Sequence, residues 1–281
     1  MTTKNIQEIP PQIRRDIVRM VHDVQSGHPG GSIGTVEFFT ALFFEILDID
    51  PKNFTVNSTG EDTFILSNGH ITPVYYSTLA RRGYFDIKEL ATFRRLGSRL
   101  QGHPSVHDGL PGVRIASGSL GQGLSVALGV AQGKKLNHDK HLVYTLHGDG
   151  ELQEGQIWEA VLYAGAKGVD NLIATVDYNN AQIDGTVDDV LSLGDLKAKF
   201  EAFNWTVVDI KEGNNLEAVI AGLKKAKSLT GQGKPVAVLL HTKMGYGIDF
   251  MEGDYRWHGK PLNDEQLEKA LAQLPETLGD Y

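Results

Sequence analysis

Residues 141–180 read HLVYTLHGDGELQEGQIWEAVLYAGAKGVDNLIATVDYNN, a segment in which two apolar runs flank a helical pattern. The runs at 141–148 and 171–180 are rich in β-branched residues and apolar on both faces, which is typical of buried parallel strands. Residues 155–168, between them, carry apolar side chains at helical spacing. A strand, a crossover helix and a second strand bring both strand ends to the same edge of a sheet.

The same alternation extends outward in both directions. Upstream, TFILSNGH (63–70) predicts a strand that turns into a helix beginning near Pro73. Downstream, buried strands are predicted at 206–210 and 235–242, and helices at 195–203 and 215–228. We therefore predict an α/β protein, a doubly wound and mostly parallel sheet with helices on both faces, in which residues 1–281 form a single domain. Ligands of such folds bind beyond the carboxyl ends of the strands.

Composition excludes several functions. The formal net charge is −8, from 27 Lys and Arg against 35 Asp and Glu, which argues against a general nucleic-acid surface. The pairs Arg81-Arg82 and Arg94-Arg95 are expected on solvated helix faces. The absence of cysteine excludes disulfides, thiolate metal sites and cysteine nucleophiles. No signal-peptide pattern or bilayer-length apolar run is found, so we expect no membrane association and a cytoplasmic protein.

The glycine pair around Asp149 fits no common nucleotide motif. The dinucleotide pattern G-x-G-x-x-G fails because Gln153 stands at the third glycine position, and no P-loop motif is present. A lone Gly-Asp-Gly is more often a turn than a binding site. Whether this segment is a turn or a binding site therefore depends on the residues that follow the next strand.

Asn179-Asn180 follows that strand, about thirty residues after Asp149. Asp149 offers a carboxylate oxygen, Asn179 an amide oxygen and Ala181 a backbone carbonyl, and such oxygen ligands suit Mg²⁺ or Ca²⁺. Gly148 and Gly150 would let the backbone approach phosphate groups closely. The alternative is a turn followed by an asparagine pair of the kind favoured at strand ends. The spacing favours the metal site.

These motifs resemble a known family. GDGELQEG followed by DYNN resembles the thiamine-diphosphate-binding motif. Five further segments resemble transketolase and occur in the order of that family: SGHPGGSIG (26–34), LSNGH (66–70), QGHP (101–104), GSLGQGLSVALG (118–129) and WHGKPL (257–262). The resemblance covers nearly the whole chain. It implies the thiamine-diphosphate-binding fold and, within it, the domain that holds the diphosphate and the metal.

The resemblance also implies roles for individual residues. Asp149, Asn179 and the carbonyl of Ala181 would hold the divalent metal. The residues implied to line the cofactor are Gly118, Ser119, Leu120, Gly148 and Gly150, with Leu120 supporting its bent conformation.

Four histidines and one glutamate complete the implied site. His70 and His258 would contact the diphosphate end, and His28, His103 and His258 would face substrate hydroxyls. Glu154 would lie at the subunit interface, directed toward a catalytic glutamate of the partner. Imidazoles suit the reaction because they can shuttle hydroxyl protons near neutral pH, while the cofactor ring stabilises the carbanion. The other histidines receive no role, namely His22, His107, His138, His141, His147 and His241.

Transketolases carry a pyrimidine-binding domain and a third domain after the segment matched here. Because the sequence ends at Tyr281, we expect a partner chain, the C-terminal transketolase subunit, in an α₂β₂ heterotetramer. The segment TKMGYG (242–247) matches the corresponding turn of the family only approximately, with Met244 in an unexpected place.

The expected activity is transfer of a two-carbon ketol unit from a ketose to an aldose, as in pentose phosphate metabolism. Whether the sugar tail carries phosphate, sulfonate or neither stays open. The alternatives are the α-subunit of a 2-oxo acid dehydrogenase, an enzyme similar to deoxyxylulose-phosphate synthase, and a non-catalytic scaffold subunit that binds the cofactor.

Overall fold

Five parallel strands form one sheet in the computed structural model, which describes residues 5–281. Their order across the sheet is β1-β2-β3-β5-β4. The strands are β1 (Thr63–Leu66), β2 (Val143–Gly148), β3 (Leu172–Tyr178), β4 (Thr206–Ile210) and β5 (Val236–His241). Residues 1–4, which belong to the expected single domain, lie outside the described residues.

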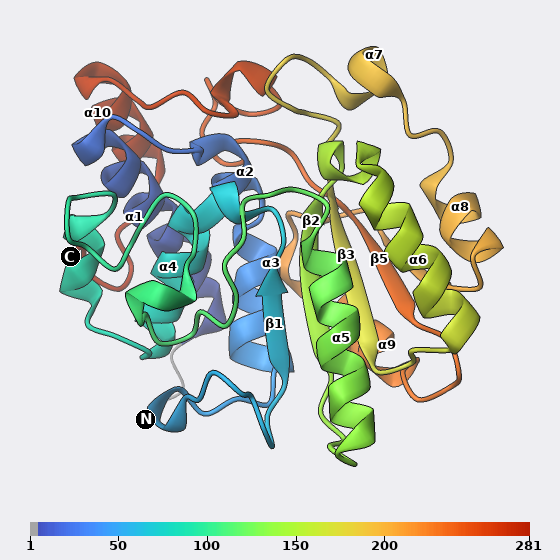
Figure 1. Ribbon diagram of the computed structural model, residues 1–281. Helices are drawn as coiled ribbons and strands as arrows, with labels where there is room; N and C mark the ends of the chain where they lie inside the picture. Colours follow the sequence, from blue (N-terminus) through green and yellow to red (C-terminus); the bar gives the residue numbers. More distant parts are fainter. Residues whose placement is uncertain (1–4) are drawn as a thin grey trace.

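Helices cover both faces of this sheet, as the alternating sequence pattern predicts (Figure 1). One face is covered by α5 (Gly123–Leu136), α6 (Gly155–Lys167) and α8 (Leu196–Ala202). The opposite face is covered by α1 (Ile9–Val24), α3 (Val36–Ala41), α4 (Thr72–Arg82), α9 (Leu216–Ser228) and α10 (Asp264–Gln273). Successive residues of a strand point to opposite faces, so Phe64 and Leu66 enter one core and Ile65 the other. The predicted fold class is confirmed.

Short helices and irregular segments join these layers at the carboxyl edge. The helices α2 (Pro29–Gly34) and α7 (Val187–Leu191) lie near this edge, at the top of Figure 1. Between α4 and α5 the chain forms only turns and two 3₁₀ helices, Ile87–Thr92 and Val106–Asp108. The sequence pattern did not predict the path of this segment, because it lacks a regular period.

The register of β2 and β3 determines where the glycine motif lies. Gly148 pairs with Asp177, so Asp149 and Asn179 leave the sheet from neighbouring strand ends. The backbone then turns sharply at Asn180, whose φ of 55° is left-handed and is tolerated better by asparagine than by most residues. Asn180 also accepts a hydrogen bond from the Asp188 amide, which connects this turn to α7.

One strand differs from the prediction. The segment 206–210 was expected to be buried on both faces, but β4 lies at the edge of the sheet and Asp209 is an exposed residue. An apolar run of five residues does not distinguish an edge strand from a central one. The other strands and the helix near Pro73 occur where the sequence predicts them.

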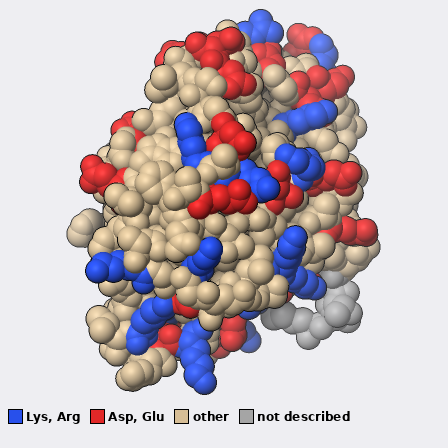
Figure 2. Space-filling view, turned by 90° about the vertical axis from the view of Figure 1, so that its right-hand side faces the viewer, with Lys and Arg blue, Asp and Glu red and all other residues tan. Residues whose placement is uncertain are grey.

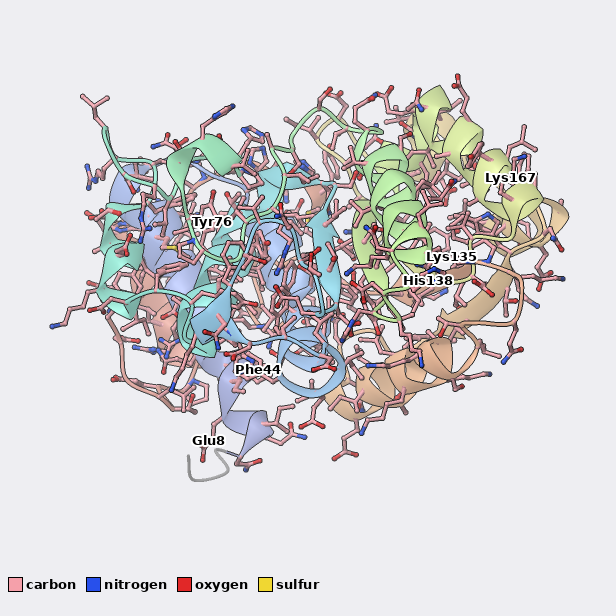
Figure 3. The ribbon with its side chains drawn as sticks, turned by 60° about the horizontal axis from the view of Figure 1, so that its bottom comes forward. Glu8, Phe44, Tyr76, Lys135, His138 and Lys167 are labelled. Carbon is pink, nitrogen blue, oxygen red and sulfur yellow. The ribbon has the colours of Figure 1, made fainter. Side chains whose placement is uncertain are left out.

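The surface shows no single dominant charge on the face seen in Figure 2, where acidic and basic side chains are interspersed. At the end of the molecule remote from the carboxyl edge, Lys135 and His138 lie at the end of α5 and Lys167 at the end of α6 (Figure 3). Within residues 5–281, no helix combines the length and the apolar character needed to cross a membrane.

Candidate active site

A cavity of about 370 Å³ opens at the carboxyl ends of β1, β2 and β3. Its walls come from segments far apart in the sequence, from His28 near the start to His258 near the end. All of the predicted site residues line it except Ser119 and Glu154. These segments meet because the parallel strands all end at the same edge of the sheet. The other lining segments pack against the loops that follow those strands.

Three of the histidines form a cluster on one wall. His28 precedes α2, His70 lies in the 3₁₀ helix Gly69–Ile71, and His258 follows the 3₁₀ helix Tyr255–Trp257. Their ring centroids are separated by 5.0 Å (28 to 70), 5.1 Å (70 to 258) and 5.5 Å (28 to 258). His103 lines the same cavity and packs against Gly118, where an added Cβ would lie 2.6 Å from the His103 Cδ2 atom.

The cluster favours neutral imidazoles. Burial, followed by the neighbouring His258, lowers the pKa of His28 to about 4. Burial is also the main cause that lowers the pKa of His70, His103 and His258. Each ring can therefore accept a proton or a hydrogen bond through one nitrogen at neutral pH and donate through the other.

The proposed metal ligands meet at the end of β2 and β3. Asp149 is almost fully buried, and its two carboxylate oxygens accept hydrogen bonds from the Gly150 amide at 2.8 Å and the Asn180 amide at 2.5 Å. The Asn179 side chain accepts a hydrogen bond from the Ala181 amide at 2.8 Å and donates one to Asp177 at 2.7 Å. Asp149, Asn179 and Ala181 all line the cavity.

The acidic groups here lack a balancing cation within residues 5–281. Burial, and then repulsion from Asp177, raises the pKa of Asp149 to about 8, and burial raises the pKa of Asp177 to about 6. A divalent ion would compensate this buried charge, so the donor set fits a metal. Among the described residues no group of three or more His, Cys, Asp or Glu side chains could hold a metal. The proposed ligand set contains only one such side chain, Asp149, together with the Asn179 amide and the Ala181 carbonyl.

Unsatisfied polar atoms support a polar ligand in the cavity. Within the described part of the chain, the buried atoms His28 Nδ1, His258 Nδ1 and Asn68 Oδ1 have no hydrogen-bond partner. Buried polar atoms are usually paired, so each calls for an explanation. All three residues line the cavity, and a bound ligand with several polar groups would supply the missing partners.

Two glycines of the site lie where a side chain would collide with a neighbouring residue. Gly118 has a φ of 126°, and a Cβ there would meet His103. A Cβ on Gly150 would lie 2.8 Å from the Gln182 side-chain oxygen. Leu120 lines the cavity, but Ser119 is exposed and does not. Glu154, the first residue before α6, is also exposed and lies against Gly121 beside the cavity.

Several lining residues were not predicted. Asn68, Gln182, Ile183 and Met244 line the cavity in addition to the predicted set. Gln182 and Ile183 lie in an irregular loop, where the sequence carries no periodic signal. Asp177 could have been found, because it precedes Asn179 by two positions and residues two apart on a strand share a face.

The arginine pairs contradict the expected solvated helix faces. Arg81 lies in α4, but its guanidinium is buried in an ion pair with Asp16. Arg94 lies in a turn, is half-buried, and donates to the Ser26 hydroxyl at 2.8 Å. Arg82 lies in α4 but is half-buried, and it donates to the Phe43 carbonyl at 2.9 Å. Arg95 is exposed and pairs with Asp23, but it lies outside any helix. A short basic run does not reveal which member has a buried partner distant in sequence.

The histidines without an assigned role lie outside the cavity. His147 is buried within β2, where it contacts Thr145 at 2.8 Å and pairs with Glu151 at 3.6 Å. His241 faces a separate, more open hollow of about 720 Å³ and lies 2.8 Å from Asp209. His22, His107, His138 and His141 do not line the cavity either.

Comparison with known proteins places this geometry in a family. The family model described as "Transketolase, thiamine diphosphate binding domain" matches residues 7–276. The chain is 39% identical to the 6-deoxy-6-sulfo-D-fructose transketolase subunit SqwG of Clostridium sp. (strain MSTE9), over 93% of each chain. It is also 39% identical to one of the subunits of the apulose-4-phosphate transketolase of Actinobacillus succinogenes, over 94% of each chain.

A solved structure gives the same result at the level of the fold. The structure of transketolase from Leishmania mexicana matches 96% of this chain with a TM-score of 0.89 and 29% sequence identity. The match covers 41% of the Leishmania chain, so this chain spans less than half the length of that relative.

Proposed function

The chain belongs to the transketolase family, to its thiamine-diphosphate-binding domain, and from this premise we propose that it is the N-terminal subunit of a two-chain transketolase. The enzyme would move a glycolaldehyde unit from a ketose, phosphorylated or otherwise anionic at its tail, to an aldose acceptor. The observation that carries the proposal is the cavity in which His28, His70, His103 and His258 lie with Asp149 and Asn179. Decarboxylation of a 2-oxo acid does not require this set of hydroxyl-binding imidazoles.

The cofactor site combines the metal ligands and the histidines. We assign Asp149, Asn179 and the Ala181 carbonyl to Mg²⁺ or Ca²⁺, and Gly118, Leu120 and the glycines around Asp149 to the cofactor. Thiamine diphosphate, when bound, would supply the electron sink for the electron pair that is left on the former carbonyl carbon when the carbon–carbon bond breaks. The chain's own residues bind the diphosphate, orient the sugar and exclude water.

The neutral imidazoles handle protons. His28, His103 and His258 would accept hydrogen bonds from sugar hydroxyls and take the proton that leaves a hydroxyl as the adjacent carbon–carbon bond breaks. Their lowered pKa values keep them unprotonated, and therefore able to act as bases, at neutral pH. His70 would serve the diphosphate end together with His258.

The partner is proposed from three observations. Two relatives that match along more than 90% of both chains are named as transketolase subunits. Glu154 and Ser119 are exposed beside the cavity, where a second chain could reach them. The adjacent helices α5 and α6 expose the apolar side chains Val126, Leu162 and Tyr163. We propose that a chain carrying a pyrimidine-binding domain covers this side, in an α₂β₂ assembly.

The names of these relatives bear on the substrate. They act, by name, on a sulfonated fructose and on apulose 4-phosphate. Within the described residues the cavity lining contains no Lys or Arg, so we propose that the partner contacts the anionic end of the sugar. This chain would then determine the recognition of the hydroxyls and the partner the recognition of the tail.

The first test is purification of the protein with its native partner, followed by an assay of ketol transfer between pentose phosphates with thiamine diphosphate and Mg²⁺. We expect turnover that requires both chains and the metal. Turnover by this chain alone would contradict the two-chain assignment. Reduction of an artificial acceptor with pyruvate, without ketol transfer, would instead support the 2-oxo acid dehydrogenase alternative. Unchanged activity of Asp149→Ala in the assembled protein would support the scaffold alternative.

A further inference from the structure

Arg94 is a half-buried arginine next to the histidine cavity that no role assigned above explains. Most arginines of the described chain are paired with a carboxylate, including Arg14 with Glu37 and Arg81 with Asp16. Arg94 forms no ion pair within residues 5–281, and its Nε atom is buried without a partner. Its backbone φ of 55° is left-handed, which is unfavourable for a long side chain. A half-buried charge without an ion-pair partner, on a strained backbone, is costly and calls for a function.

The contacts of Arg94 connect two loops that carry histidines. Its Nη1 atom donates to the Ser26 hydroxyl at 2.8 Å, two residues before His28. Its Nη2 atom lies 3.5 Å from the Gly102 carbonyl, one residue before His103. An added Cβ on Gly102 would lie 2.6 Å from the Arg94 Cζ atom, so the guanidinium packs directly on that loop.

We propose that Arg94 is a positioning residue that joins segments 26–34 and 101–104 and places a permanent positive charge near His28 and His103. A cation behind an imidazole disfavours the protonated ring. The charge therefore maintains both rings as hydrogen-bond acceptors and bases. Arg94 does not line the cavity, so it acts through the two histidines rather than on a ligand.

The surrounding charges agree in sign with this role. The groups that act on His28 are His70, His258, Arg94 and His103, and none of them is a carboxylate. Burial and then Arg94 lower the pKa of His103. Burial and then His258, ahead of Arg94 and His103, lower the pKa of His28. Asp184 acts in the opposite direction on His258.

Histidine titration by NMR tests the charge directly, without relying on activity. The comparison uses the purified full chain with its partner, as wild type, R94Q, R94K and the control R95Q. Signals are assigned through H28Q and H103Q. We expect R94Q to raise the pKa of His28 and His103 by about half a pH unit or more, and R94K to restore the wild-type titrations. R95Q removes a neighbouring exposed charge and should titrate like the wild type. Identical titrations of wild type and R94Q would overturn the proposal.

Hydrogen exchange tests the connection between the loops if R94Q does not fold. Ser26→Ala removes only the hydroxyl that accepts from Arg94. We expect faster amide exchange in both segments, 26–34 and 101–104, in this variant. Unchanged exchange in both segments would contradict the joining role.

The inference rests on the proposed function only where it assigns the neutral imidazoles a role as bases in ketol transfer. If the assembled protein transfers no ketol unit, the proposed function fails, while titration and exchange still decide the role of Arg94. If it is active, the acid limb of the kcat/KM profile should move to higher pH in R94Q and return in R94K. A lower rate with an unmoved limb would indicate a structural role alone and would overturn the proposal.

Discussion

Asp149 is a buried carboxyl group, and in the absence of a metal its ionised form destabilises the folded chain. Its folded-state pKa of about 8 lies above the ordinary value of 3.8, because the group is buried and then because Asp177 repels it. A group whose pKa rises on folding contributes stability below its unfolded pKa, and this contribution is lost as the pH rises toward the folded pKa. The metal-free chain should therefore lose stability between about pH 4 and pH 8.

Replacing this carboxyl with an amide separates the two effects. In Asp149→Asn, an NH₂ group replaces one of the oxygens that accept from backbone amides. The variant therefore loses a hydrogen bond, which lowers its stability at every pH. The pH dependence is the cleaner measure: we expect the change in unfolding free energy from pH 5 to pH 8 to shrink by about 1–3 kcal/mol. Mg²⁺ should no longer strengthen thiamine diphosphate binding. Urea denaturation and calorimetric titration measure both, with the exposed Asp188→Asn as control. An unaltered pH dependence would contradict the assigned cause.

The site residues that could be predicted from the sequence lie in short segments that are recognisable without knowledge of the fold. His28, His70 and His103 lie in short glycine-containing segments that can be recognised by themselves. Arg94 carries no such signal, because its importance comes from its contact with Ser26, which is distant in the sequence. This contact becomes visible only when the fold is known.

The loop at 118–121 depends on a 3₁₀ helix for its position. Glu151 lies in the helix Gly150–Gln153 and is buried. One of its carboxylate oxygens accepts from the Ser67 hydroxyl and the Gly121 amide, and the other accepts from the Gly148 amide at 3.2 Å. This carboxylate thus joins the ends of β1 and β2 to the loop that presents Gly118 and Leu120 to the cavity.

Glu151→Gln should loosen this arrangement with little change in shape. One carboxylate oxygen becomes a donor facing other donors, so we expect a loss of about 1–3 kcal/mol in unfolding free energy. Thiamine diphosphate should bind more weakly as well, because the loop no longer holds one position. Urea denaturation and ligand titration check the two effects, with the exposed Glu159→Gln of α6 as control. Lower stability with unchanged cofactor affinity would mean that Glu151 does not position the loop.

Secondary structure was predictable where a regular period existed. The strands around 141–180 and the helix between them follow from apolar runs bounded by glycine and polar residues. The segment between α4 and α5 has no such period, and it contributes His103, Gly118 and Arg94. Much of the candidate site therefore depends on a segment whose path only tertiary packing determines.

At the scale of the whole molecule, helices α5 and α6 expose apolar side chains on the side next to the cavity. Helices α5 and α6 pack together, with Gln132 donating to the Tyr163 hydroxyl at 2.9 Å and Gln156 to the Ser125 hydroxyl at 2.8 Å. Their outer surface exposes Val126 by 40% and Leu162 by 55%. Glu154 lies immediately before α6 and against Gly121, which follows Leu120 of the cavity lining, so this surface lies beside the cavity. Adjacent exposed apolar side chains at such a place indicate a protein interface.

The double variant Val126→Asp with Leu162→Asp tests whether the partner binds there. Both side chains are exposed, so we expect the variant to fold and to keep its melting temperature within a few degrees. Two carboxylates introduced among the apolar side chains of the interface should abolish the complex, because desolvated and unpaired charges cost several kcal/mol. Sedimentation velocity and copurification with the partner measure the association. Val56→Asp, at an equally exposed apolar residue in the loop before β1, is the control and should retain the complex. Retention of the complex by the double variant would place the partner on another surface and would leave Glu154 without its proposed role.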